Sequence, residues 1–216
     1  MRVEWHGQAA FTLQGGEGTV VIDPFGDVAA LRDRGIRWDY PPIDAPSADL
    51  VLVTHEHLDH NGVEVVGGEP AILRSQAGRH DSPLGEVVGI ASEHDEAAGT
   101  ERGPNTIFAF TLDDLRVVHF GDFGQAGLRR EQRQALGEVD LLFLPVGGGP
   151  TIGGEVRRRS PASSSPSGSC RCTTGPSGSV SSRAPTSSSP RWAGHCASRG
   201  RPSRRQSCHG TGGRSP

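Results

Sequence analysis

The sequence predicts a mixed α/β sandwich over residues 1–155. Short apolar runs bounded by turn residues recur along this part of the chain, helical patterns are few, and several runs can pair through tight turns. A chain of 216 residues fits a single domain. No apolar run reaches the roughly 18 residues of a membrane span, and the first residues lack the pattern of a secretory signal. We therefore expect a cytoplasmic protein.

Short apolar runs between residues 2 and 146 predict a series of strands. RVEW (2–5) and AAFTL (9–13), followed by a Gly-rich turn and TVVIDPF (19–25), predict an antiparallel opening. ADLVLVT (48–54) is a continuous apolar run, typical of a strand buried on both faces. Further strands are expected at PAILR, GEVVGI, NTIFAFTL, LRVVHFGD and DLLFLPV.

Only two helices are expected. GVEVVG (62–67) is one candidate. RREQRQALG (129–137) is the other, and it closes with Gly137, a residue at which helices commonly stop.

The composition divides the chain near residue 155. All 25 acidic residues and 11 of the 22 arginines precede Val156, so residues 1–155 carry a net charge of −14 and residues 156–216 carry +11. This tail is rich in Arg, Ser, Pro and Gly, holds all four cysteines and has one aromatic residue. It offers too little apolar surface to offset the entropy lost on folding, so we expect disorder. A Cys-x-Cys metal site or a basic nucleic-acid arm is disfavoured, because the tail has no predicted core, no Lys and a single Trp.

The stretch VLVTHEHLDHNG predicts a metal site. A buried strand is followed at once by His55, His57, Asp59 and His60. Alternation places His55 and His57 on the same side of an extended segment, and the turning chain lets the other two residues reach a second point close by. Imidazole and carboxylate groups suit Zn²⁺, Mn²⁺ or Fe²⁺. Four such groups within six residues disfavour the alternative, a solvated loop that is merely rich in His.

Two residues from later strand ends are candidates to complete the ligand set. His94 follows the strand predicted at GEVVGI, and Asp122 ends another strand between Gly121 and Gly124. Alone, each would be taken for a half-buried His or a turn. Beside the His cluster they predict additional ligands, because metal sites gather their ligands from several strand ends.

These residues together resemble the metallo-β-lactamase superfamily. The pattern His55-x-His57-x-Asp59-His60, the later His94 and the Gly121-Asp122 strand end are similar to its metal-binding motifs. TVVIDPF, SEHD, RGPNTIF and LGEVDLLFLPVGG resemble its small single-domain branch, which includes L-ascorbate-6-phosphate lactonase-like enzymes. The resemblance covers residues 1–154. It implies a four-layer αββα sandwich, here lacking its last strand and helix and therefore incomplete at the C-terminal end.

The resemblance also implies two Zn²⁺ ions per intact chain, with Mn²⁺ or Fe²⁺ as alternatives. The implied ligands are His55, His57 and His94 for one ion, Asp59 and His60 for the other, and Asp122 as a bridge between them.

Two features depart from the family pattern. In the first, Gly7 is followed by Gln8 where a His is expected, and the nearby His is His6. His6 and His119 are given no metal role and are assigned to packing or to the surface. The second ion should also receive a final His from a Pro-Met-His-Tyr-like strand end beyond residue 155, and no such segment is present.

A frameshift explains the missing segment. If one base is lost near codons 154–160, the codons of SCRCTT (169–174) are compatible with Val-Val-Pro-Met-His-Tyr when they are read one base earlier. The same lost base accounts together for the lack of acidic residues, the clustering of cysteines and the Ser/Arg/Pro bias of the tail.

The predicted activity is hydrolysis of a small ester, lactone or phosphoester by a metal-bound hydroxide. Asp59 either holds the second ion or orients the nucleophile. The charge of −14 argues against long polyanions such as RNA, so we expect a small-molecule substrate and no nucleic acid. The lack of a long apolar run predicts no membrane partner. The main alternative is a non-catalytic or defective metal-binding form that lacks the last ligand. A redox di-iron protein would favour Glu at position 57.

Overall fold

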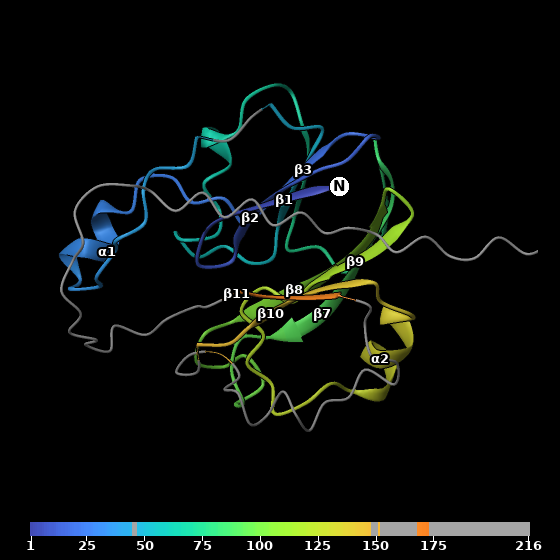
Figure 1. Ribbon diagram of the computed structural model, residues 1–216. Coiled ribbons are helices and arrows are strands. Elements are labelled where there is room, and N and C mark those ends of the chain that lie inside the picture. Colours follow the sequence, from blue (N-terminus) through green and yellow to red (C-terminus); the bar gives the residue numbers. More distant parts are fainter. Residues whose placement is uncertain (45–46, 148–150, 152–167, 173–216) are drawn as a thin grey trace, which may run out of the picture.

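Two β-sheets stack face to face in the computed structural model, which describes residues 1–44, 47–147, 151 and 168–172 (Figure 1). The first sheet holds five strands: β1 (Arg2–Gly7), β2 (Ala10–Gln14), β3 (Thr19–Ile22), β4 (Leu50–Val53) and β5 (Ala71–Arg74). The second holds six: β6 (Gly78–Ser82), β7 (Gly85–Glu93), β8 (Pro104–Leu112), β9 (Leu115–His119), β10 (Leu141–Pro145) and β11 (Gly168–Cys172).

Each sheet combines antiparallel and parallel pairs. In the first sheet β1, β2 and β3 pair antiparallel, whereas β4 pairs parallel with both β3 and β5. In the second sheet β6 to β9 form an antiparallel meander, and β10 pairs parallel with β9 and β11. The carboxyl ends of β3 and β4 therefore share one edge, and so do those of β7 and β9. These edges carry the predicted site residues.

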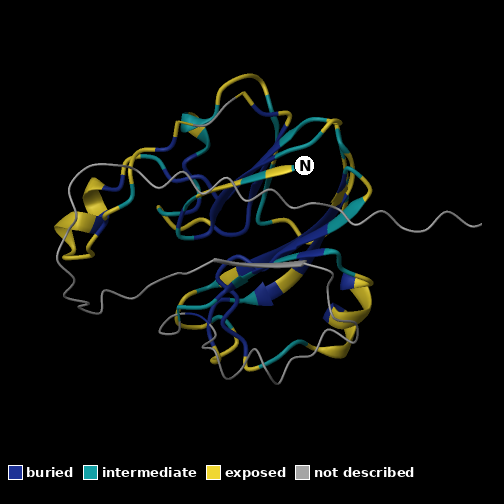
Figure 2. Cartoon of the chain, viewed as in Figure 1, coloured by how far each residue is buried: buried dark blue, intermediate teal, exposed yellow. Residues whose placement is uncertain are grey.

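The main core lies between the two sheets, where the strands of both are buried (Figure 2). The first sheet contributes apolar side chains that alternate along β2, β3 and β4. Phe108 and Phe110 of β8 and Phe143 of β10 are the largest side chains that the second sheet contributes. Burial of alternate residues on facing sheets is the packing expected of a sandwich.

Helical segments cover parts of the outer faces. Helix α2 (Arg130–Leu136) packs Leu136 against the outer face of the second sheet, beside Ile90 and Phe120. On the first sheet, the 3-10 helix η1 (Val63–Val65) and its neighbours cover Val51 and Val53. Helix α1 (Ala29–Asp33) joins a separate aromatic cluster. The layered α/β class predicted from the sequence is confirmed.

The predicted strands all form, and the differences involve polar or very short elements. GVEVVG forms only the three-residue η1, because β-branched Val disfavours a longer helix. Strand β6 was not predicted since its sequence, GRHDS, is polar, and pairing with β7 specifies it instead. Helix α1 was also missed, and it is only five residues long.

The expectation that no strand follows residue 155 differs from the structure at one place. Strand β11 pairs with the edge of β10 from Gly168 opposite Leu141 to Cys172 opposite Pro145. Backbone groups make this pairing, so it needs no apolar pattern. The remainder of the predicted tail lies outside the described residues. Within the described part, neither α-helix is long and apolar enough to cross a lipid bilayer.

Candidate metal centre

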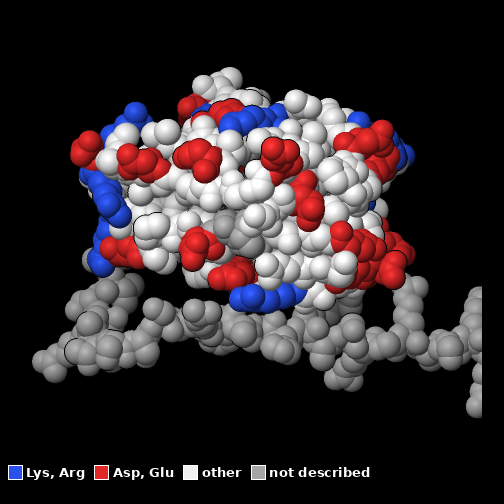
Figure 3. All heavy atoms as spheres, turned by 90° about the horizontal axis from the view of Figure 1, so that it is seen from above, with Lys and Arg blue, Asp and Glu red and all other residues white. Residues whose placement is uncertain are grey.

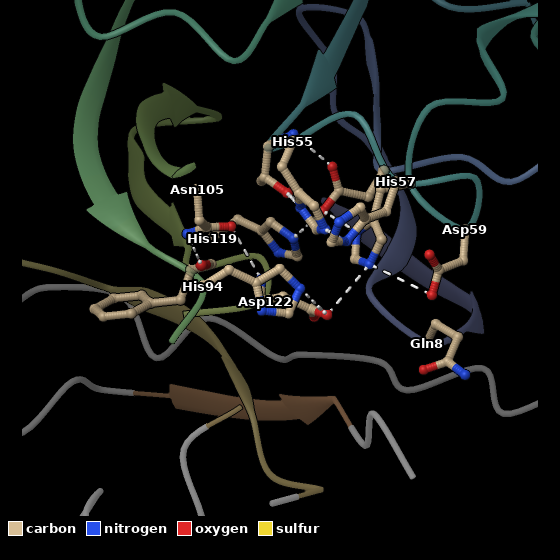
Figure 4. Close-up of polar contacts among 12 residues, drawn as sticks. Gln8, His55, His57, Asp59, His94, Asn105, His119 and Asp122 are labelled. Carbon is tan, nitrogen blue, oxygen red and sulfur yellow. Dashed lines mark hydrogen bonds and ion pairs between the residues drawn. The ribbon is translucent and has the colours of Figure 1, made fainter. Parts of the chain in front are cut away.

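The loop after β4 brings three His side chains together (Figure 4). His55 Nε2 lies 3.0 Å from His57 Nδ1, and the rings of His55 and His60 are 4.0 Å apart, centre to centre. The His60 N–H donates a hydrogen bond to the His57 carbonyl at 2.9 Å, which closes a tight turn. This turn returns the His60 ring to the side occupied by His55.

The second sheet contributes His94 and Asp122 from the ends of β7 and β9. Asp122 Oδ2 lies 3.2 Å from His94 Nε2 and 3.5 Å from His60 Nε2. The Asp122 carboxylate therefore lies between the imidazoles of the two sheets, as Figure 4 shows. All three side chains are buried.

Asp59 lies at the edge of this cluster. Its Oδ2 is 3.8 Å from His60 Nε2, and its side chain is 27% exposed. Asp59 is thus the carboxylate nearest to solvent among the residues predicted to bind metal.

Two glycines let the backbone pass close to the site. Gly121 has φ of +54°, and a Cβ there would lie 2.5 Å from Asn105 Oδ1 and from Thr54 Oγ1. A Cβ on Gly124 would overlap the His94 carbonyl group. The turn that carries Asp122 therefore requires glycine at both positions.

Asp23 is a buried carboxylate that contacts the imidazoles of His60 and His119 and also Thr54, which follows β4. It follows β3 and is fully buried with φ of +46°. Its Oδ1 accepts the Thr54 N–H at 2.7 Å. Its Oδ2 accepts from the Thr54 hydroxyl at 2.7 Å and lies 3.0 Å from His60 Nδ1 and 3.2 Å from His119 Nε2. Thr54 Oγ1 in turn lies 3.0 Å from His55 Nδ1.

Asn105 fixes the turn that carries Asp122. Its Oδ1 accepts the Asp122 N–H at 3.1 Å, and its Nδ2 donates to the Phe120 carbonyl at 2.9 Å and to Ser92 Oγ at 2.8 Å. Asn105 itself is 1% exposed. The Asp122 backbone is therefore held by a side chain of β8.

The surroundings of two imidazoles in the loop favour their neutral form. Burial lowers the pKa of His55 to about 2, and the adjacent His60 contributes to this shift. His57 is more exposed, and partial desolvation together with the neighbouring His94 lowers its pKa. Neutral imidazole is the form that binds a metal ion.

His60 and its carboxylate partners shift in opposite directions. Burial alone would lower the pKa of His60, but Asp122 and Asp23 outweigh burial and raise it well above its usual value. Burial alone would raise the pKa of Asp122, but His60 outweighs it and holds that pKa well below the usual range. The pKa of Asp23 is lowered for the same reason. Both carboxylates therefore favour the charged form of His60.

The donor atoms fit divalent ions. His55, His57 and His94 present ligand atoms within 4.8 Å of one another, and so do His55, His60 and Asp122. Two nitrogen ligands of a tetrahedral Zn²⁺ lie about 3.3 Å apart, which is close to the spacing of His55 Nε2 and His57 Nδ1. His60 Nε2 and Asp122 Oδ1 are buried but make no hydrogen bond among the described residues. An ion would satisfy both atoms.

The structure gathers all six residues predicted as ligands into one cluster, with Asp59 farthest out. His6 lies apart on β1, 2.7 Å from Thr12 Oγ1. Of the two places that the sequence offered for His119, packing or the surface, the structure shows the buried one, where His119 also contacts Asp23. The supporting roles of Asp23 and Asn105 were not predicted. The only signal for Asp23 was its position directly after a buried strand, like that of the ligands.

The sequence profile of the beta-lactamase superfamily domain matches residues 2–158 of the chain. The chain belongs to this superfamily. A UPF0173 metal-dependent hydrolase of Nitratidesulfovibrio vulgaris strain Hildenborough is 50% identical in an alignment of 174 positions that covers 68% of this chain and 69% of the relative. A UPF0173 protein of Pyrococcus abyssi is 27% identical in an alignment of 168 positions that covers 70% of this chain and 72% of the relative.

Solved structures agree with this membership. A metallo-beta-lactamase superfamily protein of Thermotoga maritima matches with a TM-score of 0.56 and 28% identity, over 73% of this chain and 68% of its own. An isothiocyanate hydrolase of Delia radicum gut bacteria shares the fold alone, with a TM-score of 0.52 and 17% identity over 74% and 79%. The predicted superfamily, its small single-domain branch and the enzyme class, metal-dependent hydrolase, are confirmed.

Proposed function

We propose that this superfamily member hydrolyses a small ester, lactone or phosphoester with two divalent metal ions, most suitably Zn²⁺. One observation supports this proposal above the others. Four imidazoles and Asp122 converge from both sheets: the His55–His57, His94–Asp122 and His60–Asp122 donor atoms lie 3.0–3.5 Å apart, and each group of three candidate ligands has its donor atoms within 4.8 Å. Nitrogen-rich sites with an added carboxylate are typical of hydrolytic zinc centres.

The protein residues divide into two ligand groups. His55, His57 and His94 would hold one ion, His60 and Asp59 would hold the other, and Asp122 would contribute to both groups. Ions bound in such a centre activate water and polarise the bond under attack. Asp59, at the exposed edge, either completes the second group or orients the attacking water.

The substrate is proposed to be a small molecule, and the protein to be cytoplasmic. Acidic side chains are spread over the face shown in Figure 3, with arginines mostly near its margins. Residues 1–155 carry a net charge of −14. A long polyanion such as RNA would meet repulsion on such a surface.

The test combines metal content with turnover. The full chain is loaded with Zn²⁺, its metal content is measured by mass spectrometry, and hydrolysis of p-nitrophenyl acetate and bis-p-nitrophenyl phosphate is followed. Two equivalents of zinc with turnover support the proposal, and His57→Ala should lose one equivalent. His80→Ala is the matched control, since His80 lies on β6 outside the cluster. Turnover that survives complete chelation would contradict the proposal.

The composition after residue 155 favours a second candidate, a defective binding form of the hydrolase. We propose that a frameshift has replaced the segment carrying the last ligand of the second ion. One equivalent of metal without turnover would support this form. Resequencing from codon 150 to the stop codon separates the two candidates. A restored base that yields Pro-Met-His-Tyr in frame makes the tail an artefact and supports the intact two-ion hydrolase, whereas DNA that encodes SCRCTT as written supports a truncated fold with at most one competent metal site.

A further inference from the structure

His119 is a buried imidazole to which neither ligand group assigns a role. It ends β9 with 0% exposure, beside Phe108 of β8 and Phe143 of β10 in the sheet register. Its ring makes an edge contact with Phe11 and a tilted contact with Phe143, each with ring centres 5.9 Å apart. An apolar side chain would suit these surroundings, so the presence of His119 calls for a physical reason.

That reason is a contact from the second sheet to the first. His119 Nε2 lies 3.2 Å from Asp23 Oδ2, while its Nδ1 has no hydrogen-bond partner within the described part of the chain. An ionised carboxylate only accepts hydrogen bonds, so Nε2 carries the proton and donates it. The imidazole thus supplies one directed N–H group to Asp23.

Asp23 connects His119 to His60, one of the predicted ligands. The oxygen that accepts from His119 also lies 3.0 Å from His60 Nδ1, and His60 Nε2 faces Asp122 from 3.5 Å. The hydrogen bond at the far nitrogen of a metal-binding His fixes its ring orientation and tautomer. The orientation of the Asp23 carboxylate therefore sets where His60 Nε2 points.

We propose that His119 is a positioning residue, which acts through Asp23 to hold His60 in the orientation that binds the second ion. This inference rests on the proposed two-ion function. His119 Nε2 reaches Asp23 from the opposite sheet, so it fixes the carboxylate from a direction that Thr54, on the same sheet, does not supply. A role in packing alone would require only the volume of the ring.

Two substitutions separate positioning from packing. In His119→Gln the side-chain amide can reach the place of Nε2 and keeps the donor. His119→Leu keeps apolar volume but has no donor. Phe143→Leu is the control, because it disturbs the packing around His119 without removing the N–H group. The full-length chains are compared for Zn²⁺ affinity by chelator competition, together with urea unfolding.

Positioning predicts a specific pattern. His119→Leu weakens binding of the second ion by about 10–100-fold and leaves the first ion within about threefold, whereas His119→Gln and Phe143→Leu stay near the wild type for both ions. Equal affinity in His119→Leu, or equal losses in His119→Gln or Phe143→Leu, would overturn the inference.

A metal-free measurement keeps this test distinct from that of the proposed function. The downfield Nδ1–H resonance of His60 in ¹H–¹⁵N NMR spectra reports its hydrogen bond to Asp23. The resonance should persist in His119→Gln and be lost to exchange in His119→Leu. If the wild type binds no second ion, the two-ion function fails. The resonance then still decides the role of His119, and its survival in His119→Leu refutes it.

Discussion

Replacing Thr54 by Val should measure how much the hydrogen bonds among Asp23, Thr54 and His55 contribute to the free energy of unfolding. The Thr54 hydroxyl donates to Asp23 Oδ2 at 2.7 Å and lies 3.0 Å from His55 Nδ1, so it joins a buried carboxylate to a predicted ligand. A hydrogen bond to a charged group contributes about 1.5–3 kcal/mol and a neutral one about 1 kcal/mol. Val has the same shape and no hydroxyl. Thr54→Val should therefore lower the free energy of unfolding by about 2.5–4 kcal/mol.

The assay is urea unfolding of the metal-free protein, followed by Zn²⁺ titration against a competing chelator. Binding of the first ion should weaken about tenfold or more, because the His55 ring loses the hydrogen bond that orients it. Thr54→Ser is the matched control: it keeps the hydroxyl and should cost about 1 kcal/mol for the lost methyl group. If Thr54→Val unfolds within about 0.5 kcal/mol of the wild type and binds zinc as tightly, the Asp23–Thr54–His55 connection does not act as described.

Three further outcomes are expected. Because Asp122 and Asp23 raise the pKa of His60, binding of the second ion should displace about one proton at pH 7, and its affinity should rise about tenfold per pH unit. Calorimetry in buffers of different ionisation enthalpy measures the number of protons released. The control, His60→Asn, should release no proton. Gly124→Ala should destabilise the protein by about 1–3 kcal/mol and weaken zinc binding, since its Cβ would overlap the His94 carbonyl; an unchanged melting temperature would count against this packing. Arg2→Ala should change stability by less than about 1 kcal/mol, because its 3.0 Å pair with Glu4 is exposed, and a larger change in urea unfolding would refute that estimate.

The strands were predictable because local sequence specifies them. Four consecutive apolar residues in β4 identified a strand buried on both faces before any partner was known. Strand β6 lacks such a pattern, and only its pairing with β7 makes it a strand. The Val-rich segment at Val63–Val65 illustrates the converse: the sequence suggested a helix, and side-chain branching confines it to a single 3-10 turn.

The candidate ligands were predictable for a different reason. His55, His57 and His60 lie within six residues, so their proximity needs no knowledge of the fold. The contact between Asp23 and His119 spans 96 residues and joins two sheets, and no local pattern reveals such a pair. Asn105 likewise reaches Asp122 only because β8 and β9 are neighbours. Supporting residues therefore become visible only in the folded chain.

The division of the candidate ligands between two sheets has a consequence for how the protein unfolds. His55, His57 and His60 belong to the first sheet, whereas His94 and Asp122 belong to the second. An ion bound by both groups would be a reversible cross-link between the two sheets of the sandwich. Free zinc at 1,000 times its dissociation constant would add about 4 kcal/mol to the stability of the folded state. Because the ion can bind both groups only after the two sheets have docked, zinc should slow unfolding far more than it speeds folding. Metal supply would then govern the lifetime of this protein as well as its chemistry.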